Sequence, residues 1–286
     1  GTCFNITADN ITLDGNGYSI IGDGDFGDWG VYAKGRLNIT IKNITSINFS
    51  RGIYFENVNS STIENSIAFS NFQNGISFSY SNNNTVKDDI ANLNTQQGIM
   101  LSWSKWNIIK ENIAKYNSID GIQLSSSSYN NVLNNTIEEN WENGITLSSS
   151  DNNLMENNIM LSNTINGIGV FASNDNSIIG GAINDSKQDA LWIAGVSENN
   201  NFTNIKIDNT NHSYYDINFA ASTINETYLI DMPHIGNYSI AGAGGIIIFK
   251  TSQLGEIKFL QAINGSGTNL TREVMILNNS VSVRSD

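Results

Sequence analysis

Residues able to do acid–base or metal chemistry are few in this chain and lie in separate places. Acidic side chains gather at three points: Asp88 and Asp89; Glu138, Glu139 and Glu142; and Asp23, Asp25 and Asp28 in the run GDGDFGD. Paired carboxylates can divide acid and base roles, and several carboxylate oxygens can hold calcium. The glycine-rich run lacks the length and the final glutamate of an EF-hand loop, so calcium there is only an alternative.

Soft metal ligands are equally sparse. The chain has two histidines, His212 and His234, and one cysteine, Cys3, all far apart in the sequence. Copper or zinc sites need clustered histidine, cysteine or methionine ligands, and a disulfide needs a second cysteine. The sequence therefore predicts no metal site, no catalytic residue and no cofactor.

The elements that would position any site follow from a repeat. A glycine, followed by an apolar residue, recurs with spacings of 22 and then 23 residues at Gly30, Gly52, Gly75, Gly98, Gly121, Gly144 and Gly167, with Ala190 in the same place. Apolar residues stand at positions +1 and +3 from this glycine, and again at +11 and +15. Such alternation indicates short strands with one buried face, about three in each period, with no room for a helix. The predicted fold is all-β, a parallel β-helix of about eight to nine 23-residue coils.

Asparagine is the dominant residue of the turns. At +9 stand Asn84, Asn107, Asn130, Asn153, Asn176 and Asn199, and at +19 stand Asn71, Asn94, Asn117, Asn140 and Asn163. In stacked coils each amide can donate to the next and accept from the previous one, so we expect two asparagine ladders.

The same register reinterprets the acidic groups. Asp88 and Asp89 fall at +13 and +14, where other coils have pairs of asparagines, which favours a place in a ladder over a catalytic pair. The glutamates at 138–142 fall in a turn and are most simply a solvated edge.

Three regions are expected along the chain. Residues 1–29 break the register and are predicted to form an N-terminal cap and first coil, and residues 30–221 form the β-helix. Residues 222–286 contain longer strands without the ladder and are predicted to form a small C-terminal β appendage that caps the coils. Stackable coil ends and a C-terminal edge strand predict a homo-oligomer or filament.

Charge limits the partners. The net charge is −13 with only 14% charged residues, so we expect no nucleic-acid partner. No run of 18 apolar residues occurs, so no membrane span is expected. An uncharged polar surface and the absence of a leader favour a processed, extracellular cell-surface protein.

Asn-x-Ser/Thr sequons are frequent, and such sequons accept N-linked glycans in exported proteins. Those expected to be glycosylated, because they fall outside the ladders, are Asn59, Asn83, Asn201, Asn211, Asn225, Asn237, Asn264, Asn269 and Asn278.

The segment ADNITLDGNGYSI, followed by coils of the form GI-x-L-x-x-S-x-x-N-x-[IV], resembles the right-handed parallel β-helix repeats of the NosD-like, pectate-lyase-like superfamily. It is most similar to those of archaeal cell-surface proteins, from residue 5 to about residue 220. The resemblance implies a right-handed helix. It carries little information on activity, because lyases, hydrolases, adhesins and structural modules share this fold.

Enzymes of this superfamily typically work on the outer face of the first strand of each coil. Positions +2 and +4 of that strand, fifteen in all, are expected to present one carboxylate, Glu56, and no lysine or arginine. Glycoside hydrolysis ordinarily needs two neighbouring carboxylates. The sequence therefore predicts that the chain is not an enzyme.

Exposed aromatic residues are a further candidate. Trp103 and Trp106 flank one turn, with Tyr129 in the matching turn of the next coil, and such a patch can stack on sugar rings or shield a corner. The favoured function is an extracellular, glycosylated structural or adhesive subunit. The alternatives are a carbohydrate-binding module and a polysaccharide-active lyase or hydrolase.

Overall fold

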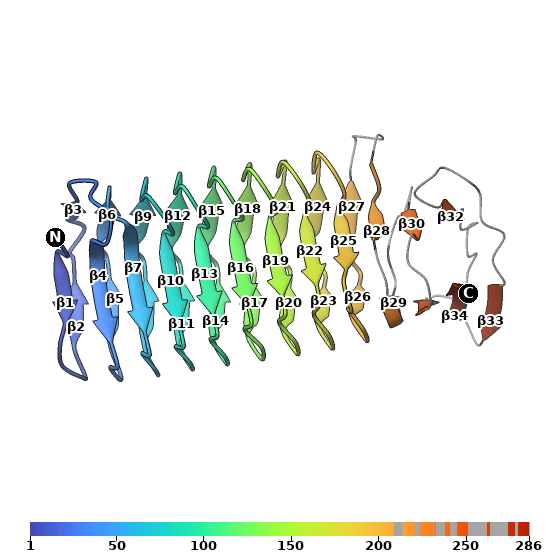
Figure 1. The fold of residues 1–286 in the computed structure, drawn as a ribbon, viewed down its shortest axis with the longest axis horizontal. Helices are drawn as coiled ribbons and strands as arrows, with labels where there is room; N and C mark the ends of the chain where they lie inside the picture. The colour runs from blue at the N-terminus through green and yellow to red at the C-terminus, as the bar shows by residue number, and fades with distance from the viewer. Residues whose placement is uncertain are drawn as a thin grey trace.

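The computed structural model describes residues 1–208, 214–220, 224–230, 232, 238–240, 245–250, 262–263, 274–277 and 280–285. The chain winds into a column of coils, with residue 1 at one end and the last strands at the other (Figure 1). Nine successive coils contribute one strand to each of three sheets, and no helix occurs in the described residues. The predicted all-β parallel β-helix with 23-residue coils is confirmed.

Sheet A collects the first strand of every coil. Its strands are β1 (Phe4–Ile6), β4 (Trp29–Lys34), β7 (Arg51–Glu56), β10 (Ile76–Ser79), β13 (Ile99–Ser102), β16 (Ile122–Ser125), β19 (Ile145–Ser148), β22 (Ile168–Phe171), β25 (Leu191–Ala194), β28 (Ile217–Phe219), β30 (Tyr238–Ile240) and β32 (Ala262–Ile263). Each strand pairs in parallel with the strand one coil away, and from β7 to β25 residues 23 apart lie side by side.

Sheets B and C collect the second and third strands. Sheet B contains β2 (Thr12–Asp14), β5 (Thr40–Lys42), β8 (Thr62–Glu64), β11 (Thr85–Lys87), β14 (Ile108–Lys110), β17 (Asn131–Leu133), β20 (Leu154–Glu156), β23 (Ser177–Ile179), β26 (Asn201–Thr203), β29 (Ile224–Ile230), β31 (Gly245–Lys250), β34 (Ser280–Ser285) and β33 (Val274–Leu277). Sheet C contains β3 (Ser19–Ile21), β6 (Thr45–Ile47), β9 (Ile67–Phe69), β12 (Ile90–Asn92), β15 (Ile113–Lys115), β18 (Thr136–Glu138), β21 (Ile159–Leu161), β24 (Ala182–Asn184) and β27 (Lys206–Asp208).

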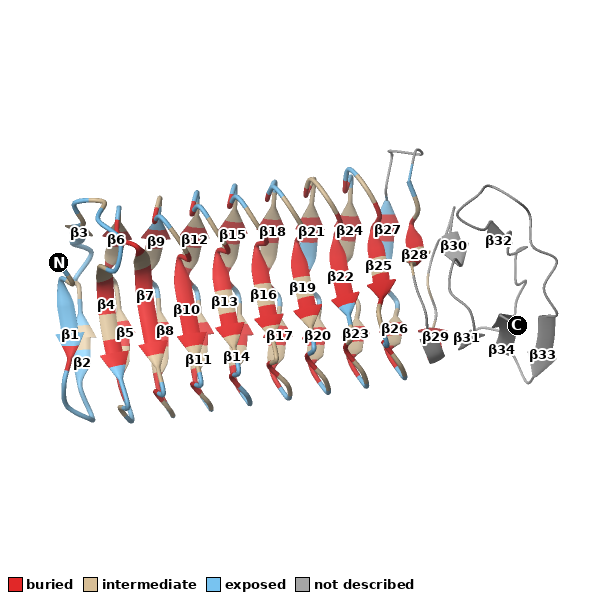
Figure 2. Cartoon of the chain, viewed as in Figure 1, coloured by how far each residue is buried: buried red, intermediate tan, exposed pale blue. Residues whose placement is uncertain are grey.

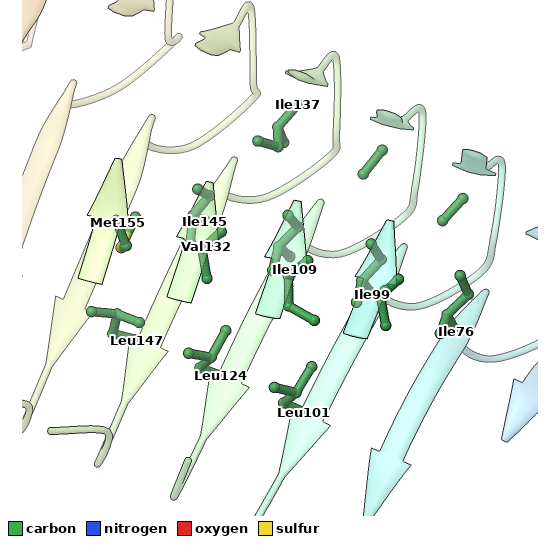
Figure 3. Packing of buried hydrophobic residues seen from close by; sticks show 14 of the residues in the cluster. Ile76, Ile99, Leu101, Ile109, Leu124, Val132, Ile137, Ile145, Leu147 and Met155 are labelled. Atoms are coloured by element: carbon green, nitrogen blue, oxygen red, sulfur yellow. The ribbon is translucent and has the colours of Figure 1, made fainter. Parts of the chain in front are cut away.

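The core is a set of stacked apolar columns. Leu101, Leu124 and Leu147 follow one another along sheet A, and Val132 lies in the facing column from sheet B (Figure 3). All four side chains are fully buried. Figure 2 shows the resulting pattern: buried residues run through the sheet A strands from β4 to β25, while exposed residues gather at the turns and on β1. The outer faces of the sheets are therefore the surface available to ligands.

The asparagine ladders form as predicted. Asn94 Nδ2 donates to Asn117 Oδ1 at 3.0 Å and Asn117 Nδ2 donates to Asn140 Oδ1 at 2.9 Å, and the ladder that begins at Asn84 is built in the same way. One member differs from the prediction. Asn176 is bonded to Asn200, and Asn199 is instead exposed, because one extra residue separates these coils.

Two more ladders are present besides those expected at +9 and +19. Asn112, Asn135 and Asn158 form a third asparagine ladder through bonds of 3.0 and 2.9 Å, at the +14 position. A serine ladder joins the turns between sheets A and B, with each backbone N–H donating to the next hydroxyl at 2.9–3.2 Å; its members are Ser81, Ser104, Ser127, Ser150, Ser173 and Ser197.

The repeated glycine has a steric reason. A Cβ atom on Gly121 would lie 2.2 Å from Cγ2 of Ile137 and 2.9 Å from Nδ2 of Asn140. Real Cβ atoms do not approach other atoms so closely, so a side chain here would displace the core and the ladder amide. The glycine and the asparagine ladder thus require each other.

Both ends of the coil stack continue its sheets. Within residues 1–29, strands β1, β2 and β3 pair in register with β4, β5 and β6, so this segment is a coil of the β-helix. The predicted boundary at residue 222 falls between β28 and β29. Strands β29, β30 and β31 continue sheets B and A in parallel, while β34 runs antiparallel to β31 and β33.

Candidate functional site

The outer face of sheet A combines polar, charged and aromatic side chains around two hollows. We call it the sheet A face: the outward side chains of its strands together with the residue at position −1, just before the repeated glycine. The −1 residues are Arg51, Asn74, Gln97, Asp120, Asn143, Asn166 and Asp189. Sequence reasoning missed this column because it considered only positions +2 and +4.

The −1 residues form a row of amides and carboxylates. Asn143 Nδ2 donates to Asp120 Oδ1 at 3.0 Å, and Asn166 Nδ2 donates to Asn143 Oδ1 at 2.9 Å. Asp189 continues the row, since its backbone N–H donates to Asn166 Oδ1 at 3.2 Å and its Oδ2 accepts from Asn218 Nδ2 at 2.7 Å. These bonds hold each group in place without a ligand, which is the preorganisation that binding sites need.

Both carboxyl groups of this row are buried and hold their protons unusually well. Burial raises the pKa of Asp120 to about 6, against the hydrogen bonds from Asn143 that lower it. Burial also raises the pKa of Asp189, although Asn218 and the backbone of Tyr215 donate to it. Because the charged form loses hydration on burial, such carboxyl groups are stronger bases than ordinary aspartates.

The larger hollow on this face encloses about 500 Å³ around Asp189. Its lining combines three chemistries: the carboxyl group of Asp189, the amides of Asn143, Asn166, Gln188 and Asn218, and the rings of Trp192, Tyr214 and Tyr215. Trp192 is held against Phe171, with ring centroids 6.3 Å apart and planes within 6°. Aromatic faces beside fixed amide donors and acceptors suit a polar ring with an apolar face, such as a sugar.

A smaller hollow of about 330 Å³ lies over strands β10 and β13. Its lining includes Asn74, Gln97 and Met100, and Arg51 is the only charged residue among those that line it. Arg51 is fixed on two sides, because its Nε donates to Gln73 Oε1 at 3.0 Å and its guanidinium carbon lies 4.3 Å from the centre of the Tyr54 ring.

A charged and aromatic cluster lies beside Arg51 on β4 and β7. Glu56 accepts from the Tyr32 hydroxyl at 2.6 Å and pairs with Lys34 at 2.7 Å. The bond from Lys34, and after it the bond from Tyr32, lowers the pKa of Glu56. Burial, and after it the bond to Glu56, raises the pKa of Tyr32. Lys34 occupies the +4 position of its coil. The expectation that positions +2 and +4 have no lysine or arginine is therefore wrong.

The acidic groups singled out in the sequence are not brought together into one site. Asp89 is buried in the +14 ladder, as predicted, and Asp88 has the positive φ of a turn residue. Glu138 pairs with Lys115, while Glu139 accepts from Tyr116 at 3.4 Å. Glu142 is half-buried at its turn.

Metal chemistry has no obvious place in the described part of the chain. Asp25 donates its backbone N–H to Asp23, and Asp28 pairs with the amino group of Gly1 at 2.5 Å. No group of three histidine, cysteine or acidic residues there is arranged to hold a metal ion, and Cys3 is an exposed thiol. His212 and His234 lie outside the described residues.

The aromatic candidates lie on a different part of the surface. Trp103, Trp106 and Tyr129 occupy the turns between sheets A and B, and each is roughly half exposed. Trp106 and Tyr129 stack with ring centroids 5.8 Å apart. The structure therefore brings these three residues together at one corner of the coil, as the register predicted.

The sequons stay predictions. Asn83 is exposed and Asn201 is half-buried, while the half-buried Asn59 accepts from the backbone N–H of Asn82 at 2.8 Å. The side chain of Asn225, on β29, is not described, and Asn211, Asn237, Asn264, Asn269 and Asn278 lie outside the described residues.

Solved structures that resemble this chain include several named for activity on alginate and the Dettilon tailspike protein gp208, which matches with a TM-score of 0.56 and 16% identity over 84% of this chain and 57% of the tailspike. The periplasmic alginate epimerase AlgG matches with a TM-score of 0.58 and 20% identity over 63% of this chain, which spans about half (47%) of the epimerase. The A-module of the Azotobacter vinelandii mannuronan C-5 epimerase AlgE4 matches with a TM-score of 0.61 and 14% identity over 84% of this chain and 79% of its own length. Alginate lyase from Paenibacillus sp. str. FPU-7 matches with a TM-score of 0.58 and 12% identity over 63% of this chain and 72% of the lyase.

These likenesses establish the fold, and they contradict the prediction that the chain is not an enzyme. That prediction rested on the +2 and +4 positions of sheet A, whereas the buried carboxyl groups of Asp120 and Asp189 and the cation of Arg51 stand at −1. No helix in the described residues is long and apolar enough to cross a membrane. No curated protein sequence matches the chain. The family model described as "Right handed beta helix region" matches residues 29–183, more than half of the length, and the chain belongs to that family.

Proposed function

We propose that this chain is an exported protein that binds an acidic polysaccharide along the sheet A face and modifies it. The observation that carries the proposal is the 500 Å³ hollow, in which a buried carboxyl group, fixed amides and aromatic rings converge. The smaller hollow with Arg51 lies on the same face, several coils away. A polymer lying along the coil axis can occupy both, with Arg51 donating to a sugar carboxylate.

The chemistry of the larger hollow favours proton abstraction over hydrolysis. Hydrolysis of a glycosidic bond ordinarily uses two carboxyl groups within 10 Å, and Asp189 is the only carboxyl group among the residues that line this hollow. One base of raised pKa suits removal of the proton from the ring carbon that bears a uronic acid carboxylate. The amide of Asn166 gives one N–H to Asn143 Oδ1 and can donate the other to that carboxylate as negative charge develops on it.

Two outcomes follow from this first step. In elimination, the electron pair of the broken C–H bond forms a carbon–carbon double bond, the neighbouring C–O bond breaks, and the leaving oxygen takes a proton from water. In epimerisation, water gives a proton to the same carbon from the opposite face, and Asp189 releases the proton that it abstracted to the resulting hydroxide. Similar structures are named for both reactions, as an alginate lyase and as alginate epimerases, which supports this reaction class.

The test uses alginate and polygalacturonate as probes. Ultraviolet absorbance detects the double bond formed by elimination, and proton NMR in heavy water detects exchange at the ring carbon. We expect Asp189→Asn to lower the rate by about 100-fold or more, since general-base catalysis contributes at least that much, while binding persists. Asp208→Asn, an exposed aspartate on sheet C, is the matched control.

The pH profile provides a second readout. Asp189 must be ionised to accept a proton, so activity should rise as the pH rises through its elevated pKa. Full activity of Asp189→Asn on a substrate that the wild-type protein turns over would refute the assignment. The structural or filament subunit predicted from the sequence, its archaeal surface type and its assembly through coil ends receive no support from the similar structures.

A further inference from the structure

Four aromatic side chains form an exposed patch on the turns between sheets A and B. The aromatic turn patch consists of Tyr80, Trp103, Trp106 and Tyr129, which are 54%, 57%, 55% and 47% exposed. They come from three successive coils. Tyr80 and Trp103 have ring centroids 6.3 Å apart and planes within 13°, and Trp106 and Tyr129 have centroids 5.8 Å apart and planes within 17°.

The backbone at these four positions does not favour aromatic residues. Each has a positive φ, between 51° and 62°. At the matching turn positions, the other coils have asparagine, aspartate, serine or alanine. These residues are Asn57, Ser60, Asn83, Ser126, Ser149, Asn152, Ala172 and Asp175. Asparagine and aspartate are enriched in this region, whereas a bulky side chain there is an outlier. Folding of the turn therefore does not explain the four aromatic rings.

Rigid turns hold the rings in place. The backbone N–H of Ser81 donates to the hydroxyl of Ser104 at 3.0 Å, and Ser104 donates to the carbonyl of Ser102 at 2.9 Å, directly beside Trp103. Asn107 Nδ2 donates to the carbonyls of Ser81 and Lys105 at 3.0 and 3.1 Å. The rings thus stand on a backbone that is fixed by two ladders, and a ligand does not have to order it.

The patch is continuous with the sheet A face. Ser79 and Ser102 line the smaller hollow, and the next residues along the chain are Tyr80 and Trp103. A polymer leaving that hollow toward the turns therefore meets the patch first. Within the turn segments 80–83 and 103–106, Lys105 is the only charged residue.

We infer that the aromatic turn patch is an accessory binding site for sugar residues of the polysaccharide that occupies the sheet A face. The inference rests on the proposed function and adds a second contact area outside the two hollows. Tryptophan and tyrosine offer flat apolar faces to the C–H groups of a sugar ring, and Lys105 can attract its carboxylate. Linking a second site to the first raises the affinity only for chains long enough to reach both.

The experiment compares alginate chains of different length. Wild-type protein and the double variant Trp103→Ala/Trp106→Ala are titrated with long alginate and with short oligomers, and intrinsic fluorescence or calorimetry measures binding. Trp141→Ala, which removes a 69% exposed tryptophan from another corner of the coil, is the matched control. We expect the double variant to bind long alginate about tenfold more weakly, and the control and short oligomers to change less than twofold.

Three results would overturn the inference. The first is equal affinity of the double variant and the wild-type protein for long alginate. The second is an equal loss for short and long chains, which would place the effect in the hollows. The third is a self-associating wild-type protein that the double substitution makes monomeric in sedimentation velocity, which would identify the patch as an interface between copies. Wild-type protein that binds neither alginate nor polygalacturonate would instead refute the proposed function itself.

Discussion

The buried turns and the sheet A face of this protein follow opposite rules. In the ladder that runs through Asn94, Asn117 and Asn140, the same residue recurs in five successive coils because each amide bonds to its copies in the neighbouring coils. On the sheet A face the −1 residue changes from Arg51 through amides and Asp120 to Asp189. A residue type that repeats from coil to coil indicates a position constrained by bonds between coils. A residue type that varies indicates a position that is not constrained in this way and can contact a ligand.

Breaking a ladder tests the first half of this comparison and has the largest expected effect. Asn117→Ala removes the donor to the carbonyl of Ala91 and the acceptor for both nitrogens of Asn94. Because buried groups left without partners cost about 1–3 kcal/mol each, we expect a loss of about 2–4 kcal/mol in unfolding free energy. Chemical denaturation measures it. The control Asn131→Ala, on the outer face of β17, should cost less than about 0.5 kcal/mol; an equal loss in both variants would contradict the ladder's role.

Restoring a missing ladder bond is expected to give the next largest change in unfolding free energy. Asp89 stands at the +14 ladder position, and its Oδ2 is buried without a partner among the described residues. Asn112 donates to the carbonyl of Val86 from the equivalent place, so Asp89→Asn can donate to Ile63 in the same way. We expect a gain of about 1–3 kcal/mol at neutral pH.

The pH dependence of this gain has a definite sign. Burial holds the pKa of Asp89 well above its usual value, so the folded state disfavours the ionised form. Wild-type stability is therefore full below about pH 4, where unfolded aspartate is protonated, and falls as the pH rises toward the folded pKa. The advantage of Asp89→Asn should vanish in acid and reach its maximum above the folded pKa. An advantage independent of pH would show that the charge of Asp89 is not the cause.

Changing the variable face should leave the fold intact and affect binding. Trp192 lines the larger hollow and is half-buried against Phe171. We expect Trp192→Ala to weaken alginate binding about tenfold, which corresponds to about 1.4 kcal/mol, with little change in thermal unfolding. A variant that loses stability but keeps its affinity would place Trp192 with the structural residues.

The smallest effect concerns salt. The net charge of −13 repels an anionic polymer at long range, while Arg51 attracts a carboxylate locally. Raising the ionic strength from 0.01 to 0.1 M shortens the Debye length from about 30 to 10 Å, so alginate binding should strengthen a few-fold. Binding of a neutral mannan that does not depend on salt, combined with no binding of alginate, would replace the acidic substrate with a neutral one.

Much of the fold follows from local rules that a sequence displays directly. Alternation at +1 and +3 predicts the strands, because side chains of a strand point to opposite faces, and the constant 23-residue spacing predicts stacking. Asn199 shows where a constant spacing fails as a guide, because the ladder member in that coil is Asn200. An inserted residue can be absorbed anywhere in a turn, and only the bond between Asn176 and Asn200 decides where.

The candidate site depends on tertiary structure for a physical reason. Apart from Arg51, which begins β7, the −1 residues lie just before their strands, outside the alternation of the strand. Periodicity therefore does not tell whether their side chains face the core, the solvent or a hollow. Sequence alone determined the coil, its ladders and the aromatic corner, since these repeat or stand out by residue type. Only the folded chain decided that Asp189 is buried, carries a raised pKa and shares a hollow with Trp192, because burial and proximity arise from segments brought together in space.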